Sequence, residues 1–234
     1  MVTRTNGALD WSHAHTSKFE LDKTGLIIFT NKRTPDPIRP HKTIPLTRPS
    51  VTINGQEVKP SLSLKFLGVI LDQELRFKAQ ADYAAAKGKF WITQTRRVSK
   101  TAKGIKGHLS RQLYKAAAVP AMFYGASVWL TPIVQSTTKG KKSKGSIGAT
   151  TRLAKVQRMA AIHITGAMCT TASDVLDAHA DLLPMDLLID KHCFREALQL
   201  ATLLKSHPLY SHVHQAAKHK LRKHPFTKSC MPTQ

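Results

Sequence analysis

The chain has 234 residues, and 41% of them are hydrophobic, which is enough for a core in one large domain or two small ones and excludes a disordered chain. Its 36 lysines and arginines outnumber 14 aspartates and glutamates, so the formal net charge is +22. An excess of this size calls for an anionic partner, either a phosphate backbone or an anionic membrane surface.

The first third of the chain is predicted to contain short strands joined by loops. The apolar run over residues 24–30 is typical of a buried strand, and the proline-rich residues 35–49 are expected to form a loop. Asn54-Gly55, set between two β-prone triplets, is the pair favoured in a two-residue type I′ hairpin turn. Residues 64–72 are apolar on both faces over most of their length, which predicts one strand covered on both sides.

Beyond these strands the chain is predicted to be helical. Apolar residues recur at intervals of four and three from Phe77 to Val98, which predicts a helix that runs to about Lys103. A second helix should begin at Gly107 and stop or kink at Pro120. Further helices are predicted over residues 152–166, 172–179, 185–204 and 210–224. The predicted fold class is therefore α+β, mainly α.

The basic residues are concentrated in an interval that contains no carboxylate. No acidic residue occurs between Asp82 and Asp174. Solvated charged faces usually alternate in sign, so this interval is expected to bind phosphate groups. It includes a Lys/Gly/Ser/Thr tract over residues 137–151, which is predicted to be an exposed basic loop. The residues assigned to nucleic-acid binding are Lys78, Lys89, Arg96, Arg97, Lys100, Lys103, Lys141, Lys142 and Lys144.

Four aromatic residues in the same interval have two interpretations. Trp91, Tyr114, Tyr124 and Trp129 could stack on nucleic-acid bases. Their spacing and their apolar neighbours favour packing in the protein core instead.

The sequence lacks the patterns of a metal centre and of a membrane span. It has no carboxylate cluster of the kind that two-metal phosphoryl transfer needs, and its C-terminal histidines match no structural zinc pattern. We therefore expect no metal and no cofactor. The uncharged stretch between Lys115 and Lys139 is long enough to span a bilayer, but its prolines, glycine and alanines favour a pair of buried helices. We expect no membrane insertion.

Several short motifs occur in a recognisable order along most of the chain. They are Ser17–Glu20, Lys23–Phe29, Lys65–Asp72, Leu113-Tyr114, Pro120, Tyr124-Gly125, Trp129, Val156–Arg158, Gly166, Thr170-Thr171, Leu176 and Pro184-Met185. This ordered set resembles the reverse transcriptases of non-LTR (LINE-type) retrotransposons, in the segments that follow the catalytic Asp-Asp motif of the palm.

The resemblance implies a division of the chain and a partner. Residues 1–75 would be the end of the palm with a primer-grip-like hairpin, 76–133 a helical thumb, 134–150 a basic flexible loop and 151–234 a helical C-terminal region. The partner would be RNA or DNA, as a template–primer duplex along the basic flank of the thumb. The sequence assigns no preference between the two and no oligomeric state.

The resemblance also assigns roles to four residues. Lys23 would match the palm lysine that lies near the nucleotide triphosphate, and Phe66, Leu67 and Gly68 would match the primer grip. Independently of the resemblance, a glycine inside a strand covered on both sides marks a close approach of two backbones, which agrees with a primer grip at Gly68.

The palm segments that hold the metal-binding aspartates have no counterpart in the chain. We therefore expect no polymerase activity from the chain alone, with Mg²⁺ bound only if a missing palm were supplied. The chain is expected to be a transposon remnant or partial gene product with an exposed apolar strand edge near residues 26–29. The alternatives are a basic helical scaffold that binds a protein partner, and, less favoured, a membrane-associated protein.

The expected location is intracellular. The three cysteines are widely spaced, which argues against a disulfide framework, and the N-terminus lacks the apolar core of a secretory signal. The lysine-rich tract and the transposon resemblance favour the nucleus over the cytoplasm.

Overall fold

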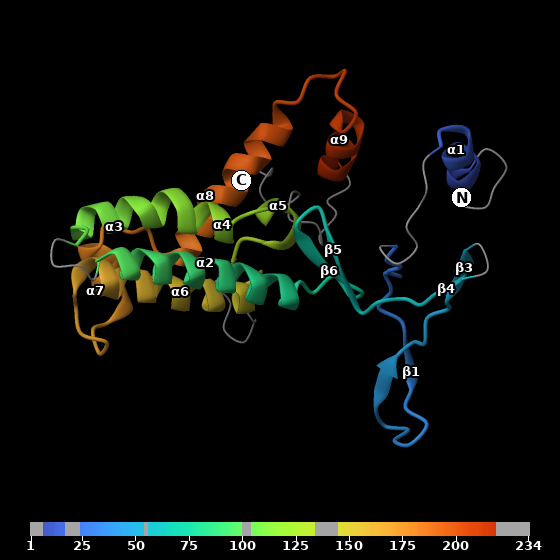
Figure 1. Ribbon diagram of the computed structural model, residues 1–234, viewed down its shortest axis with the longest axis horizontal. Helices are drawn as coiled ribbons and strands as arrows, with labels where there is room; N and C mark the ends of the chain where they lie inside the picture. Colours follow the sequence, from blue (N-terminus) through green and yellow to red (C-terminus); the bar gives the residue numbers. More distant parts are fainter. Residues whose placement is uncertain (1–6, 17–23, 54–55, 100–103, 134–144, 219–234) are drawn as a thin grey trace. The chain divides into compact units, whose positions relative to one another are not determined.

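The computed structural model describes residues 7–16, 24–53, 56–99, 104–133 and 145–218 (Figure 1). The chain divides into a first unit, which ends at Phe77, and a second unit, which begins at Lys78. Helices predominate, and the strands form small antiparallel pairs. The predicted α+β class with mainly helical structure is confirmed at this level.

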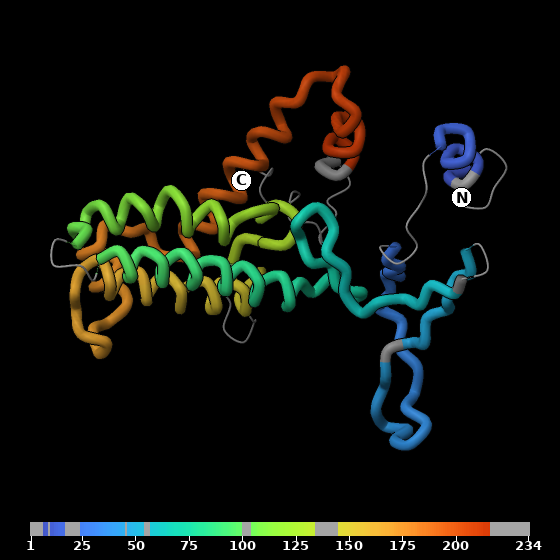
Figure 2. The backbone as a smooth tube through the Cα atoms, in the orientation of Figure 1, coloured from blue at the N-terminus to red at the C-terminus, as the bar shows by residue number. Residues whose placement is uncertain are grey.

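The first unit combines one short helix with two-stranded antiparallel hairpins, and Figure 2 traces the backbone of its described residues. Its elements are α1 (Ala8–Ala14), β1 (Arg33–Pro35) paired with β2 (Thr43–Pro45), β3 (Val51–Ile53) paired with β4 (Gln56–Val58), and β5 (Ser63–Phe66) paired with β6 (Val69–Asp72). Ile53 faces Gln56 across the second hairpin, so the predicted two-residue connection is confirmed. The connecting Asn54 and Gly55 lie outside the described residues.

Two predictions for the first unit are wrong. Residues 24–30 form no strand: they make a single parallel bridge between Leu26 and Pro60, and Phe29 is exposed. The proline-rich segment is not all loop, because it contains the β1–β2 hairpin. Both strands of an isolated pair are edge strands, where a proline's missing N–H can face outward, so Pro35 and Pro45 are tolerated.

The predicted single strand over residues 64–72 is also wrong, because the chain reverses in its middle. Leu67 and Gly68 have φ angles of 47° and 85°, the signs that a two-residue type I′ turn requires, and they connect β5 to β6. The continuous apolar run thus belongs to two short strands. Phe66 and Leu67 are exposed, so the segment is not covered on both sides.

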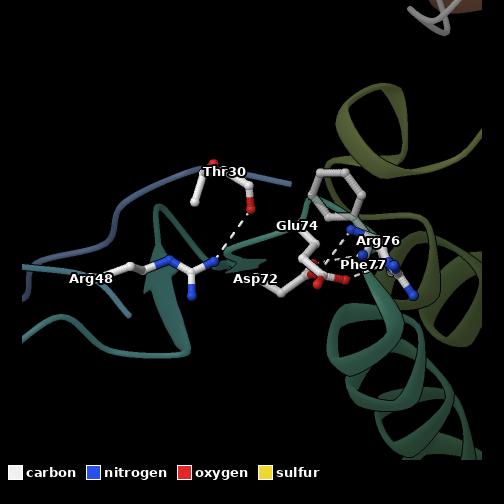
Figure 3. Close-up of polar contacts among 6 residues, drawn as sticks. All are labelled: Thr30, Arg48, Asp72, Glu74, Arg76 and Phe77. Carbon is white, nitrogen blue, oxygen red and sulfur yellow. Dashed lines mark hydrogen bonds and ion pairs between the residues drawn. The ribbon is translucent and has the colours of Figure 1, made fainter. Parts of the chain in front are cut away.

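Arginine and aspartate side chains fix the loops of the first unit (Figure 3). Arg48 donates hydrogen bonds from its guanidinium to the carbonyl oxygens of Ile28, at 3.1 Å, and Thr30, at 3.3 Å. The two carboxylate oxygens of Asp72 accept the backbone N–H groups of Arg76 and Phe77 at 2.9 and 2.7 Å. These bonds satisfy backbone groups that no strand pairs.

The second unit is helical in the part that the structure describes. Its elements are α2 (Lys78–Ser99), α3 (Gly107–Leu113), a π-helical turn (Tyr114–Ala118), α4 (Val119–Met122), α5 (Ala126–Trp129), α6 (Ile147–Thr165), α7 (Ser173–His179), α8 (Met185–Ala201) and α9 (Tyr210–Lys218). Figure 1 shows α2 and α3 running alongside α6. Met122 of α4, Leu130 at the end of α5, and Leu153 and Val156 of α6 are fully buried.

Helix ends in the second unit differ from the predictions in two places. The helix that begins at Gly107 does not stop at Pro120 but continues to Met122, and its regular α-helical pattern is interrupted just before the proline by the wider π-helical turn, so only the predicted stop is wrong. Helix α6 begins at Ile147, inside the tract predicted to be a loop, rather than at Arg152. Within the described ranges, no helix is long and apolar enough to cross a membrane.

Candidate nucleic-acid interface

Two helices of the second unit bring basic side chains to a shared border. On α2, Asp82, Lys89 and Arg96 follow one another at seven-residue spacing, which places them on one side of the helix. On α6, Arg152, Lys155 and Met159 are three and four residues apart, and so share one side of that helix.

Two contacts show that these sides face each other. The guanidinium Nε of Arg152 lies 2.6 Å from a carboxylate oxygen of Asp82. The guanidinium of Arg96 donates a hydrogen bond of 3.3 Å to the backbone carbonyl of Met159. Lys89 and Lys155 lie between these two contacts along their helices. We call this border, made of Lys89, Arg96, Arg152 and Lys155, the α2–α6 seam.

The seam keeps an excess of positive charge. Its neighbouring carboxylate, Asp82, is paired with Arg152, and the next acidic residue in the sequence is Asp174. In the described part of the chain neither Lys89 nor Lys155 has an ion-pair partner, and both are exposed. Two exposed lysines without ion-pair partners among the described residues, beside two arginines, favour a ligand that carries several negative charges.

Other arginines of the same charge interval are occupied by the fold. Arg158 donates hydrogen bonds of 2.7 Å to the side chain of Ser173 and to the backbone carbonyls of Cys169 and Thr171, which holds the loop before α7 against α6. Arg111 pairs with Asp181. The charge interval that the sequence singled out therefore divides into cations used for structure and cations that face solvent.

The sequence-predicted site residues do not all come together. Lys89 and Arg96 lie in the seam. Lys78 is the first residue of α2. Arg97 is exposed on another side of α2, where it donates a hydrogen bond to Gln94. Phe66, Leu67 and Gly68 belong to the first unit. Lys23, Lys100, Lys103, Lys141, Lys142 and Lys144 lie outside the described residues. Arg152 and Lys155 were not among the predicted site residues, because their place in the seam depends on the packing of α6 against α2.

A histidine closes one end of the seam. His163 of α6 lies with its Nε2 atom 3.2 Å from the hydroxyl of Ser99, at the end of α2. Burial, and next the charge of Arg96, lower the pKa of His163 below its usual 6.5. The imidazole therefore favours its neutral form beside the arginine.

Acidification is expected to destabilise the second unit through His163. Folding lowers the pKa of His163, so the unfolded chain binds the proton more readily than the folded chain. The contribution of neutral His163 to the free energy of unfolding is therefore fully present above pH 6.5. It is lost as the pH falls through the lowered pKa. His163→Gln should flatten this dependence, leaving the part due to His192, whose pKa burial also lowers. Urea unfolding between about pH 5 and pH 7 measures it. Identical pH slopes in both proteins would contradict the assignment.

The four aromatic residues divide into two pairs. Tyr114 and Trp129 are buried, at 4% exposure each, as the core interpretation predicted. Trp91 and Tyr124 are 42% and 52% exposed, so that interpretation is wrong for them.

A cavity of about 480 Å³ opens in the helical unit. Its lining includes Tyr114, Gln157, Leu183, Leu188 and Lys191. The hydroxyl of Tyr114 donates to Gln157 Oε1 at 3.3 Å, and Gln157 Nε2 donates to Asp177 at 3.0 Å and to the carbonyl of Leu183 at 2.9 Å. Burial raises the pKa values of Tyr114 and Asp177, because it disfavours the charged form of each group.

No protein-family model, curated protein or solved structure matches this chain. Within the described ranges, no group of histidine, cysteine or acidic side chains is placed to hold a metal ion. The functional interpretation therefore depends on the geometry and charge of the second unit.

Proposed function

We propose that the second unit binds nucleic acid, with phosphate groups contacted along the α2–α6 seam. The observation that carries this proposal is the joining of cations from two helices at one border whose neighbouring carboxylate is already paired. Contacts to phosphate supply affinity that depends on salt and carry no sequence information. The proposal therefore concerns binding without base specificity.

The resemblance to non-LTR reverse transcriptases supports the same proposal from another direction. Helix α2 falls in the region that would be the thumb, whose basic flank would track a template–primer duplex. On this proposal the chain corresponds to the end of the palm and the thumb of such an enzyme. The turn at Leu67 and Gly68 would serve as its primer grip, since a tight backbone turn is the feature that a primer grip uses.

The test is a paired charge reversal on the seam. Lys89→Glu with Lys155→Glu changes two exposed residues and removes no hydrogen bond or ion pair of the described structure. We expect at least a tenfold loss of affinity for a labelled duplex, and a fall of about 2 in the slope of log K against log salt, because each phosphate contact contributes about one unit. Fluorescence anisotropy at several salt concentrations measures both quantities.

The matched control carries the same charge change elsewhere in the second unit. Lys191→Glu with Lys205→Glu alters two exposed lysines, of α8 and of the segment after it. It should weaken binding far less than the seam variant and leave the salt slope nearly unchanged. Equal losses of affinity in both variants would show that binding depends on the overall charge, and would contradict phosphate binding at the seam. No binding by the unmodified protein at low salt would contradict nucleic-acid binding altogether.

A second candidate function is the binding of a protein partner through α8. Leu187, Phe194 and Leu198 are exposed at spacings of seven and four, so they form an apolar stripe along one side of that helix. Exposed apolar stripes of this kind are common in interaction surfaces. This second candidate function would be favoured over nucleic-acid binding if the duplex titration showed no binding.

A further inference from the structure

A second surface of α2 combines aromatic and basic side chains. Tyr83, Lys87, Phe90, Gln94 and Arg97 follow one another at intervals of four, three, four and three, so they lie along one side of the helix. We call these five residues the aromatic stripe. Trp91 flanks it and is 42% exposed, whereas Phe90 within it is 57% exposed.

The side chains of the aromatic stripe are organised by contacts with one another and with the neighbouring Trp91 and Tyr124. Lys87 Nζ lies 4.7 Å from the ring centroid of Tyr83 and 5.6 Å from that of Tyr124. The rings of Phe90 and Trp91 meet edge to face, with centroids 5.8 Å apart and planes 77° apart. Cation–π and edge-to-face contacts restrain these side chains, so their flat faces are held in place before a ligand arrives.

The chemistry of the aromatic stripe fits a ligand with exposed π faces and negative charge. Lys87 and Arg97 are its two charged members, and none of its residues is acidic. A buried core surface would not carry these cations, and a purely electrostatic surface would not need Phe90 and Trp91. Unpaired nucleotides offer bases that can stack on aromatic rings beside phosphates that meet cations. In a duplex the bases are already stacked on one another.

We infer that the aromatic stripe binds single-stranded nucleic acid, with bases stacked on Phe90 and Trp91 and phosphates near Lys87 and Arg97. The inference rests on the proposed function and deepens it, because it adds the class of nucleic acid. It gives the exposed aromatic residues a role that the α2–α6 seam does not provide. A nonspecific stack tolerates any base, so no sequence preference is expected.

The experiment follows the fluorescence of Trp91 during titration with an oligothymidylate. A Trp11→Phe background removes the other exposed tryptophan, and Trp129 is buried. Stacking of a base on Trp91 should quench its emission, whereas a hairpin duplex of equal nucleotide count should quench it far less. Phe90→Ala and Trp91→Ala should each weaken oligothymidylate binding by about 5- to 150-fold, from about 1–3 kcal/mol per stacked base. The salt slope should stay unchanged.

Two controls keep the result interpretable. Phe194→Ala removes an equally exposed phenylalanine on α8 and should leave binding unchanged. Trp91→Phe retains an aromatic face and should restore most of the affinity that Trp91→Ala loses, which separates stacking from a folding defect.

The failure of this inference differs from the failure of the proposed function. If Phe90→Ala and Trp91→Ala bind the oligothymidylate like the unmodified protein while the Lys89/Lys155 reversal still abolishes duplex binding, the stacking inference is overturned and the seam stands. If the aromatic variants weaken duplex and single strand equally, stacking is again overturned. If the unmodified protein binds neither probe at low salt, both proposals are overturned.

Discussion

Gln157→Leu is expected to lower the free energy of unfolding of the second unit by about 2–4 kcal/mol, because it breaks a buried hydrogen-bonded network without much change in volume. Gln157 is 2% exposed and joins three parts of the fold: Tyr114 in the π-helical turn, Asp177 in α7 and the backbone of Leu183. Leucine would leave the Tyr114 hydroxyl and the Leu183 carbonyl without this partner. Urea unfolding followed by circular dichroism at pH 7 measures the loss.

Two further variants separate the contributions within this network. Tyr114→Phe combined with Gln157→Leu removes both ends of one hydrogen bond, so the double variant should cost less than the sum of the single variants. Asp177→Asn keeps an oxygen that can accept from Gln157, and burial already disfavours the Asp177 carboxylate, so this variant should not destabilise the protein at neutral pH. Additive costs in the first case would mean that the network does not act as a unit.

Gly88→Ala is expected to lower the free energy of unfolding by about 1–3 kcal/mol through overpacking. A Cβ atom at this position would lie 2.4 Å from Met122 Sδ and 2.9 Å from Val156 Cγ1. Met122 and Val156 are fully buried, so neither side chain has space to move away. This cost should exceed the gain of about 1 kcal/mol that alanine brings over glycine inside a helix.

A second helical glycine serves as the control, because its substitution by alanine is expected to change the free energy of unfolding in the opposite direction. At Gly148 of α6, the nearest atom to an added Cβ is Arg152 Nη1, at 3.5 Å, so Gly148→Ala should raise the free energy of unfolding by up to about 1 kcal/mol. Met122→Ala is destabilising by itself, but combined with Gly88→Ala it should cost less than the sum of the two single variants, because it opens space for the new methyl group. Thermal and urea unfolding measure all of these variants. A stabilising Gly88→Ala would contradict the close packing of α2 against α4 and α6.

The course of α2 and most of its buried side could be predicted from the sequence, but the edge of that side could not. Spacings of four and three defined the helix, yet Trp91 and Val98 from the predicted core face are exposed. The buried side is made of small residues around Ala81, Ala84 and Gly88, because α2 lies close to its neighbours. Ala81, Ala84 and Gly88 belong to the predicted face, so periodicity identified the core side of α2 and failed only for the large side chains at its margin.

The candidate site could be predicted from the sequence only in part. Lys89 and Arg96 could be placed on one flank of α2 from their spacing alone. That Arg152 and Lys155 complete the seam depends on the packing of α6 against α2, a contact between residues about 60–70 positions apart that no local pattern specifies. In the first unit, the unbroken apolar run gave no local sign of the turn at Leu67 and Gly68, because leucine is an unusual residue for a positive φ angle, and only the resemblance implied a hairpin there.

The π-helical turn between α3 and α4 changes the period of the whole helical run. Ser110, Tyr114, Ala118 and Met122 are four residues apart, and all four are buried. In a regular α-helix each step of four residues rotates a side chain by about 40° beyond a full turn, so such a series would wind away from the core. The wider turn holds more residues per revolution and cancels part of that rotation. A helical segment in which every fourth residue is apolar or small, and which contains a proline near its end, is thus a pattern that predicts such a widened turn in other sequences.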